Sequence, residues 1–369
     1  MKGVTTCDLF GSYLPSRSSS ADGPVGNHTL NYGDPTDPDT QTAVVLSYYR
    51  DDVTVANVTI SDQIFGVMTE GVEKLAGIAG IFGLAPDLEA GFEEGEPYSL
   101  MLNSMVEKGL IKSRAFALDL RHAESETGAV IYGGLDVAKF TGKPAALPLQ
   151  RGVAGEARLA VSIASVGVTR NGKRSTHRVG KDHAAAVLDS GTTLSRLHPL
   201  LARPILQDLG ASVAPDDFYL APCALRNSSA TVDFGFGEPG SDAAMTLRVR
   251  VSDFVMDLQH EGNDDLCYVG LAITEHQQIL GDSVLRSGYF VFDWDNEQVH
   301  IAQAANCGTE IVAIGKGKDA VPDVEGKCSL DGEGKPTVAP VSLPPSPSPP
   351  HFPYASQRLH LGCAPYCPT

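Results

Sequence analysis

The sequence is poor in basic residues, and this scarcity limits the partners that the protein can have. Its 369 residues contain 28 lysines and arginines against 45 aspartates and glutamates, which gives a formal net charge of −17 at pH 7. Proteins that bind nucleic acids place lysine and arginine against the phosphates, so we expect no nucleic-acid partner. The acidity is typical of an acid-tolerant secreted protein, but it would equally serve to keep any protein soluble.

A long hydrophobic run is also missing. No stretch of the sequence approaches the roughly 20 apolar residues that a membrane-spanning helix needs. Residues 1–20 have no apolar core of the kind that a signal peptide carries. We therefore expect neither a membrane span nor a signal peptide in this chain.

The composition fits a folded, mainly β protein. Hydrophobic residues make up 42% of the chain and charged residues 20%, which is enough for packed cores, and the length suits two or three domains. The 38 glycines and 24 prolines divide the apolar stretches into many short strands. Two helices are expected, over residues 97–108 and 198–209. The second begins at Pro199, ends before Gly210 and is interrupted at Pro204.

The most informative segment is Asp-Ser-Gly-Thr-Thr at 189–193, which follows the apolar run at 184–188. A buried strand of small and branched residues that breaks at Gly191 would present the carboxylate of Asp189, flanked by hydroxyl groups, in a cleft. A catalytic aspartate is presented in this way. Short strings also recur by chance, so the surrounding sequence has to decide between a site and an accident.

The surrounding sequence supplies further landmarks. An apolar, apolar, glycine loop at 279–281 is followed by aromatic and branched runs around a turn at Asp295 and Asn296. Segments in the first half that fit the same pattern lie at 10–20, 30–34, 62–67, 77–84 and 126–136. Together these segments resemble the pepsin-like aspartic proteases, most closely the secreted fungal ones, from about residue 7 to about residue 315.

The resemblance implies a mainly β, bilobal pepsin-like acid protease fold in which the first lobe is incomplete. Residues 1–156 would form the N-terminal lobe with the flap, the hairpin that closes over the substrate. Residues 157–315 would form the C-terminal lobe with the Asp-Ser-Gly-Thr-Thr loop. Residues 316–369, which are rich in proline, serine and glycine, are expected to be a disordered tail.

The resemblance also assigns the site residues. Asp189 takes the place of the second catalytic aspartate, and Ser190 and Thr192 take the hydroxyl positions that brace it and its loop. Substrate contacts are implied for the catalytic loop and for the flap, through Gly191, Thr192 and Thr193 and through Tyr32, Gly33 and Asp34. No metal and no organic cofactor are implied.

One landmark of the family is missing. If the two lobes are duplicates, the first catalytic aspartate should precede Gly83 by the same number of residues as Asp189 precedes Gly281. That position falls before Met1. The sequence contains no Asp-Thr-Gly and no second Asp-Ser-Gly. We therefore expect the chain to be truncated at its N-terminus, to lack the first strands and the first catalytic aspartate, and to be inactive or nearly so as it stands.

Cysteine usage indicates a compartment outside the cytosol. The family carries a disulfide where this chain has Cys223 and Cys267, and Cys7 would have lost its partner with the missing segment. The other cysteines that could pair are Cys307 with Cys328 and Cys363 with Cys367.

Three acceptor patterns for N-glycosylation would suit the secretory pathway, although each is a common string. They place candidate sites at Asn27, Asn57 and Asn227. For the intact protein we expect an extracellular or secretory location.

The function implied is that of a monomeric aspartic-type endopeptidase, which hydrolyses peptide or protein substrates with an aspartate-activated water. A non-catalytic relative that binds peptides or protein partners in the same cleft is the alternative. A third possibility is that Gly-Asp-Ser-Val at 281–284, with Asp257 and His260, forms a GDS-type serine esterase site. The order of these elements is reversed from that family, and residues 189–193 would be left unexplained.

Overall fold

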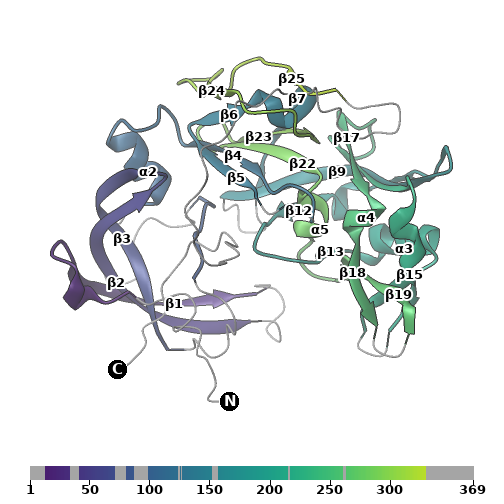
Figure 1. The fold of residues 1–369 in the computed structure, drawn as a ribbon, viewed down its shortest axis with the longest axis horizontal. Coiled ribbons are helices and arrows are strands. Elements are labelled where there is room, and N and C mark those ends of the chain that lie inside the picture. Colours follow the sequence, from purple (N-terminus) through teal and green to yellow (C-terminus); the bar gives the residue numbers. More distant parts are fainter. Residues whose placement is uncertain are drawn as a thin grey trace, which may run out of the picture. The chain divides into compact units, whose positions relative to one another are not determined.

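The computed structural model describes residues 13–33, 41–70, 80–86, 99–123, 125, 127–151, 157–214, 217–260 and 263–329. These residues form two compact units, one comprising the described residues up to 111 and the other those from 112 onward (Figure 1). Strands dominate both units, which confirms the mainly β fold that the sequence predicts.

The first unit contains a three-stranded antiparallel sheet in the order β1-β2-β3 (Figure 1). Val44, Leu46 and Tyr48 alternate along β2 toward a small core that Met68 of β3 completes. Such alternation is what a sheet with one buried face requires. The elements of this unit are η1 (Pro15–Arg17), β1 (Asp22–Tyr32), β2 (Thr42–Val55), β3 (Val58–Glu70) and α2 (Met101–Glu107), the last lying within the helix expected over 97–108.

A buried carboxylate on β2 fixes the segment that precedes β1. Asp51 is 5% exposed and accepts hydrogen bonds from the hydroxyl groups of Ser20 (2.6 Å), Tyr13 (2.8 Å) and Ser18 (2.9 Å), as well as from the backbone N–H of Asp52 (2.8 Å). Burial alone would raise the pKa of Asp51, but these hydrogen bonds stabilise the ionised form more strongly and hold its pKa at about 2.

A six-stranded sheet lies in the second unit, in the order β25-β7-β23-β22-β4-β5 (Figure 1). Strands β4, β5 and β7 of this sheet come from the predicted N-terminal lobe, and β22 and β23 come from the predicted C-terminal lobe. The boundary between the lobes at residue 156 stays a prediction. A two-stranded pair, β6 with β24, adds to the apolar cluster of this region, which includes Leu135 and Tyr289. The elements are β4 (Ala115–Asp119), β5 (Ala129–Tyr132), β6 (Gly134–Asp136), η4 (Val137–Lys139), β7 (Phe140–Pro148), β22 (Gly288–Asp293), β23 (Gln298–Ala304), β24 (Ile311–Ala313) and β25 (Gly326–Lys327).

A ten-stranded sheet in the same unit carries the candidate site. Its main path is β17-β16-β9-β12-β21-β13-β20, and β8, β10 and β11 pair with β9 outside that path. The strands are β8 (Gln150–Arg151), β9 (Ala157–Arg170), β10 (Lys173–Arg174), β11 (His177–Arg178), β12 (Ala185–Leu188), β13 (Ser195–Leu197), β16 (Thr231–Phe236), β17 (Met245–Arg250), β20 (Leu271–Ile273) and β21 (Ile279–Leu280).

The remaining elements of the second unit are a four-stranded sheet, in the order β14-β15-β19-β18, and short helices. The strands are β14 (Ser212–Val213), β15 (Tyr219–Pro222), β18 (Val255–His260) and β19 (Asn263–Val269). The helices are η5 (Lys181–His183), α3 (Pro199–Leu209), η6 (Cys223–Asn227), α4 (Val251–Phe254) and α5 (Asp282–Leu285).

Helix α3 has the start and the end that the sequence predicts. His198 caps it, Pro199 is its first residue, and Gly210 ends it in the left-handed conformation (φ 68°). The interruption expected at Pro204 is wrong, because the helix continues through this residue. Proline cannot donate to the carbonyl four residues earlier. That carbonyl belongs to Leu200, which is 65% exposed, so water can take the lost bond.

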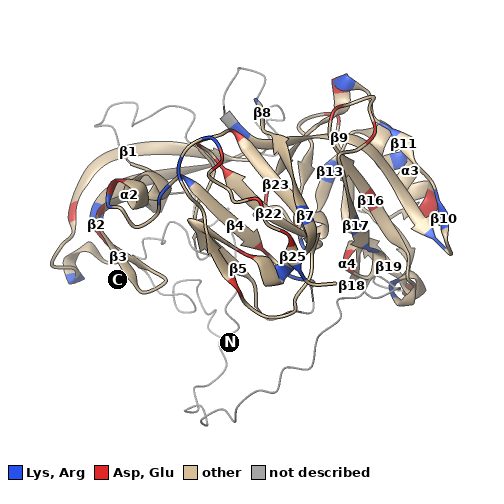
Figure 2. Ribbon diagram, turned by 90° about the horizontal axis from the view of Figure 1, so that it is seen from above, with Lys and Arg blue, Asp and Glu red and all other residues tan. Residues whose placement is uncertain are grey.

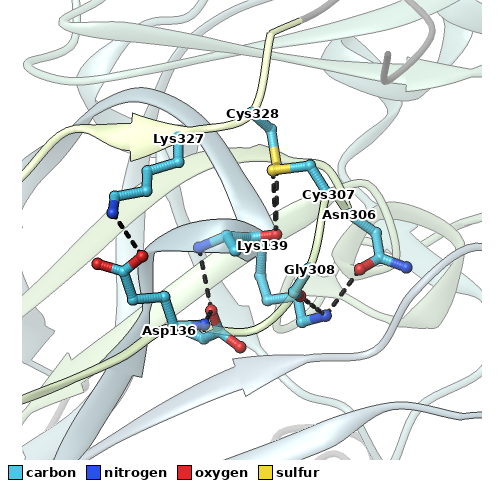
Figure 3. Close-up of a disulfide and its surroundings, with 9 residues drawn as sticks. Asp136, Lys139, Asn306, Cys307, Gly308, Lys327 and Cys328 are labelled. Atoms are coloured by element: carbon cyan, nitrogen blue, oxygen red, sulfur yellow. Dashed lines mark hydrogen bonds and ion pairs between the residues drawn. A yellow bond between two sulfur atoms is a disulfide. The ribbon is translucent and has the colours of Figure 1, made fainter. Parts of the chain in front are cut away.

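The folded part of the chain continues past residue 315, so the disordered tail that the sequence predicts from residue 316 begins too early in the prediction. Cys328 is buried and forms a disulfide with Cys307 (Figure 3). Around Cys307, the ammonium group of Lys139 donates to Asn306 Oδ1 (2.7 Å) and to the carbonyl of Gly308 (Figure 3). The disulfide and the pairing of β25 with β7 hold residues 326–328 on the six-stranded sheet. Residues 330–369 lie outside the described part of the chain.

A second disulfide joins Cys223 of η6 to Cys267 of β19 (S–S 1.99 Å). It links the two residues that the resemblance paired. Cys7, Cys363 and Cys367 lie outside the described residues.

The Asp51 contacts predict how the stability of the first unit depends on pH. A carboxylate whose folded pKa lies below its unfolded value stabilises the fold above pH 4, and the contribution is lost as the pH falls from about 4 to 2. The loss should amount to about 2 kcal/mol. Denaturant titrations between pH 7 and 2 measure it. Asp51→Asn should flatten the dependence of the unfolding free energy on pH, whereas Asp52→Asn at the exposed neighbour should not. If Asp51→Asn leaves this dependence unchanged, the contacts of Asp51 are refuted.

The disulfide between Cys223 and Cys267 closes a sequence separation of 44 residues. By restricting the unfolded chain, it should stabilise the second unit by about 3–4 kcal/mol. Chemical unfolding of the wild type and of the Cys223→Ser, Cys267→Ser double variant measures this difference. Peptide mapping without reduction is the direct check, and the finding of both residues as free thiols would exclude the pairing.

Candidate active site

Asp189 lies where strand β12 ends. Ala186 and Leu188 of this strand are 1% and 5% exposed, so its core-facing side chains fix its position. β12 pairs with β9 on one side and, in parallel, with β21 on the other. The backbone N–H of Asp189 still bonds to the carbonyl of Leu280 (3.0 Å), so the aspartate is the last residue held by the sheet.

The loop after Asp189 turns back onto its carboxylate. The N–H of Gly191 donates to Oδ1 (2.9 Å), and the hydroxyl of Thr192 donates to Oδ2 (2.6 Å). Each oxygen keeps a lone pair for another partner, such as a water molecule. The side chain of Asp189 is partly exposed, and Ser190 and Thr193 are exposed. The structure therefore brings Thr192 onto the carboxylate and leaves Ser190 at the surface.

The Asp189 loop crosses the loop that contains Gly281. The carbonyl of Thr192 accepts the N–H of Asp282 (2.8 Å), and the carbonyl of Thr193 accepts the N–H of Ser283 (3.2 Å). This approach needs glycine at position 281, because a Cβ atom there would lie 2.3 Å from the carbonyl oxygen of Thr192. The glycine of the apolar, apolar, glycine motif at 279–281 is thus required for steric reasons.

Two buried serines join this crossing on the core side of the sheet. Ser195 and Ser283 are 0% and 5% exposed, and their hydroxyl oxygens lie 2.8 Å apart. Ser195 Oγ accepts the N–H of Gly281 (3.0 Å), and Ser283 Oγ donates to the carbonyl of Gly270 (2.6 Å). Both hydroxyl groups are therefore satisfied in one continuous chain of hydrogen bonds. This pair of serines could not be predicted from the sequence, since serine is common in loops and strands alike.

The same contacts exclude the serine esterase interpretation. A nucleophilic serine needs an accessible hydroxyl group beside a base. Ser283 is buried, and its hydroxyl hydrogen is committed to the carbonyl of Gly270.

The flap residues belong to the first unit. Tyr32 is the last residue of β1, pairs with Thr42 and packs on the small core of that unit. Gly33 follows with φ 115°, a conformation that favours glycine. Asp34 lies outside the described residues.

The three candidate glycosylation sites are all exposed. Asn57 lies in the turn between β2 and β3 (φ 62°), and Asn227 ends η6. Asn27 lies within β1, where its side-chain oxygen accepts a hydrogen bond from the hydroxyl of Ser47 (2.8 Å).

Basic and acidic residues are interspersed along the strands and loops of the second unit (Figure 2). On the β10–β11 side, Arg174 lies 3.4 Å from Asp233, and Arg178 lies 2.7 Å from Asp242. Within the part of the chain that the structure describes, no group of three or more His, Cys, Asp and Glu residues could hold a metal ion. None of the helices described is both long and apolar enough to cross a membrane.

Comparison with known proteins identifies the family. Residues 2–304 match the family described as eukaryotic aspartyl protease. The chain belongs to this family of pepsin-like proteins, and Asp189, its glycine and its threonine lie within the matched residues.

The relatives include fungal aspartic proteases. Probable aspartic-type endopeptidase opsB of Aspergillus fumigatus is 27% identical over 325 residues, which cover 86% of this chain and 64% of that protein. Secreted aspartic protease 5 of Candida albicans is 30% identical over 319 residues, which cover 84% of this chain and 68% of that protein. The chain thus spans slightly less than two thirds of the length of the Aspergillus relative.

A solved structure shows the same fold. The aspartic proteinase from Irpex lacteus matches with a TM-score of 0.62 at 19% identity, over 79% of this chain and 85% of that one. The pepsin-like fold that the sequence resemblance implied is therefore confirmed.

The crossing of the two loops gives a sharp mutational test. Gly281→Ala places a methyl group against the backbone of Thr192, so the loops must separate, and we expect a loss of about 3 kcal/mol or more of unfolding free energy. Gly180→Ala is the matched control, because a Cβ atom there meets nothing within 4 Å. Thermal unfolding of both variants compares them. Equal stability of the two would contradict the close approach.

Proposed function

We propose that Asp189 is one of the two catalytic carboxylates of an aspartic-type endopeptidase. One observation carries the proposal. In this chain, a member of the aspartyl protease family, the carboxylate of Asp189 lies at the end of a buried strand, and each of its oxygens accepts a hydrogen bond from the loop that follows. Fixing the carboxylate in advance lowers the cost of positioning a water molecule beside a peptide bond.

The chemistry needs a pair of carboxylates that share one proton. Two such groups held close together cannot both ionise easily, so one stays protonated. The ionised member takes a proton from water, which attacks the peptide carbonyl carbon, while the protonated member donates to the carbonyl oxygen. Asp189 supplies one member, and the hydroxyl of Thr192 holds one of its carboxylate oxygens in place.

The second carboxylate has no candidate of the same pattern in this chain. Asp-Ser-Gly occurs once in the 369 residues and Asp-Thr-Gly does not occur. In this proposal the 369 residues alone have little or no peptidase activity. Gly191, Thr192 and Thr193 would contact the substrate backbone from the catalytic loop.

The proposed location is extracellular. Relatives in Candida albicans are named secreted aspartic proteases. Two disulfides and exposed acceptor asparagines fit an oxidising, glycosylating compartment. The substrate class in this proposal is peptides and proteins, bound by a monomer, and Asn57 in its exposed turn is a candidate for glycosylation.

A second candidate function is peptide binding without cleavage. The single Asp-Ser-Gly motif favours it, because a lone carboxylate can bind a peptide but cannot supply an acid and a base at once.

The proposal makes a clear prediction for the 369-residue chain. Its cleavage of denatured protein at acid pH should be close to background, since the loss of one member of a catalytic unit removes most of its effect. Proteolysis of a fluorescent casein between pH 3 and 6 measures this. Robust cleavage that Asp189→Asn abolishes would show that another carboxyl group serves as the partner and would refute the low activity.

A further inference from the structure

Arg196 lies on the same face of the ten-stranded sheet as Asp189. Side chains alternate along a strand, and register partners on neighbouring strands share a face. Val187 of β12 pairs with Ile279 of β21, which in turn pairs with Arg196 of β13. Asp189 follows Val187 by two residues and keeps the sheet hydrogen bond, so its side chain lies on this face too.

The opposite face is the buried one. Ser195 and Leu197, which flank Arg196, are both 0% exposed, as is Leu280 beside Ile279. Val187, Ile279 and Arg196 are instead partly exposed. Arg196 therefore belongs to the accessible row that leads from the Asp189 loop across β21 to β13.

The guanidinium group of Arg196 has no partner within the described residues, neither a carboxylate within 4 Å nor a hydrogen-bond acceptor. Its neighbours in the row are apolar, Ile279 on one side and Ala272 of β20 on the other. The titratable side chains that follow on this edge, His198 and Glu275, face each other, with Nε2 of the histidine 3.6 Å from Oε2 of the glutamate. A partly buried arginine among apolar side chains is a ready site for a carboxylate.

We infer that Arg196 is a specificity-determining residue that binds an acidic side chain of the peptide substrate. The inference rests on the proposed function of Asp189. Two strand spacings, about 10 Å in all, separate the β12 and β13 positions of the row. An extended peptide advances about 3.4 Å per residue, so the acidic residue would lie two or three positions from the peptide bond at Asp189.

Binding tests the inference without any need for cleavage. Labelled peptides that carry a non-cleavable reduced peptide bond are made in pairs with Glu or Gln at each of three positions on either side of that bond. Fluorescence anisotropy at pH 5.5 should show about five- to tenfold tighter binding of the Glu peptide at one position. The preference should fade below pH 4, where the glutamate is protonated, and in high salt.

Variants assign the preference to its residue. Arg196→Gln should abolish it, and Arg196→Lys should keep part of it. Arg170→Gln is the matched control, an exposed arginine at the end of β9 that should leave it unchanged. Equal binding of Glu and Gln peptides by the wild type, or a preference that survives Arg196→Gln, would overturn the inference alone. If no peptide of either kind binds, the proposed function fails and the inference fails with it.

Discussion

The candidate site depends on one contact between two backbones. The loop after Asp189 and the loop at Gly281 cross so closely that the carbonyl of Thr192 accepts the N–H of Asp282, and a methyl group at Gly281 would lie 2.3 Å from that carbonyl. The crossing fixes Thr192, and Thr192 in turn fixes a carboxylate oxygen of Asp189. The absence of a side chain at Gly281 therefore allows the loop after Asp189 to take this position.

The two faces of the sheet around this crossing differ in burial and in the side chains that they carry. On the core side, the hydroxyl groups of Ser195 and Ser283 satisfy each other and the backbone, so the polar groups of the crossing are buried without loss. On the accessible side, Asp189 and Arg196 offer one negative and one positive charge without a counterion among the described residues. A rigid, satisfied layer beneath reactive side chains is what a preorganised site requires.

The sequence predicted those features that depend on residue type at fixed spacing. The Asp-Ser-Gly motif, the glycine loop and helix α3 could be found because glycine and proline restrict the backbone in known ways. The buried Asp51 contacts and the pair of Ser195 and Ser283 could not, because their partners are distant in the chain and of common types. The polar composition after residue 315 predicts a disordered tail, whereas the Cys307–Cys328 disulfide and strand β25 hold residues 326–328 on the fold.

The most direct test of the central claim, that Asp189 is a catalytic carboxylate, is the cleavage of a peptide substrate at acid pH by the protein as its own cells produce it. Asp189→Asn should lower kcat at least about a thousandfold with a small change in KM, because the group acts on the reacting atoms. Asp182→Asn, at an exposed aspartate on η5, should leave kcat unchanged. Full activity of the Asp189→Asn enzyme would contradict the account.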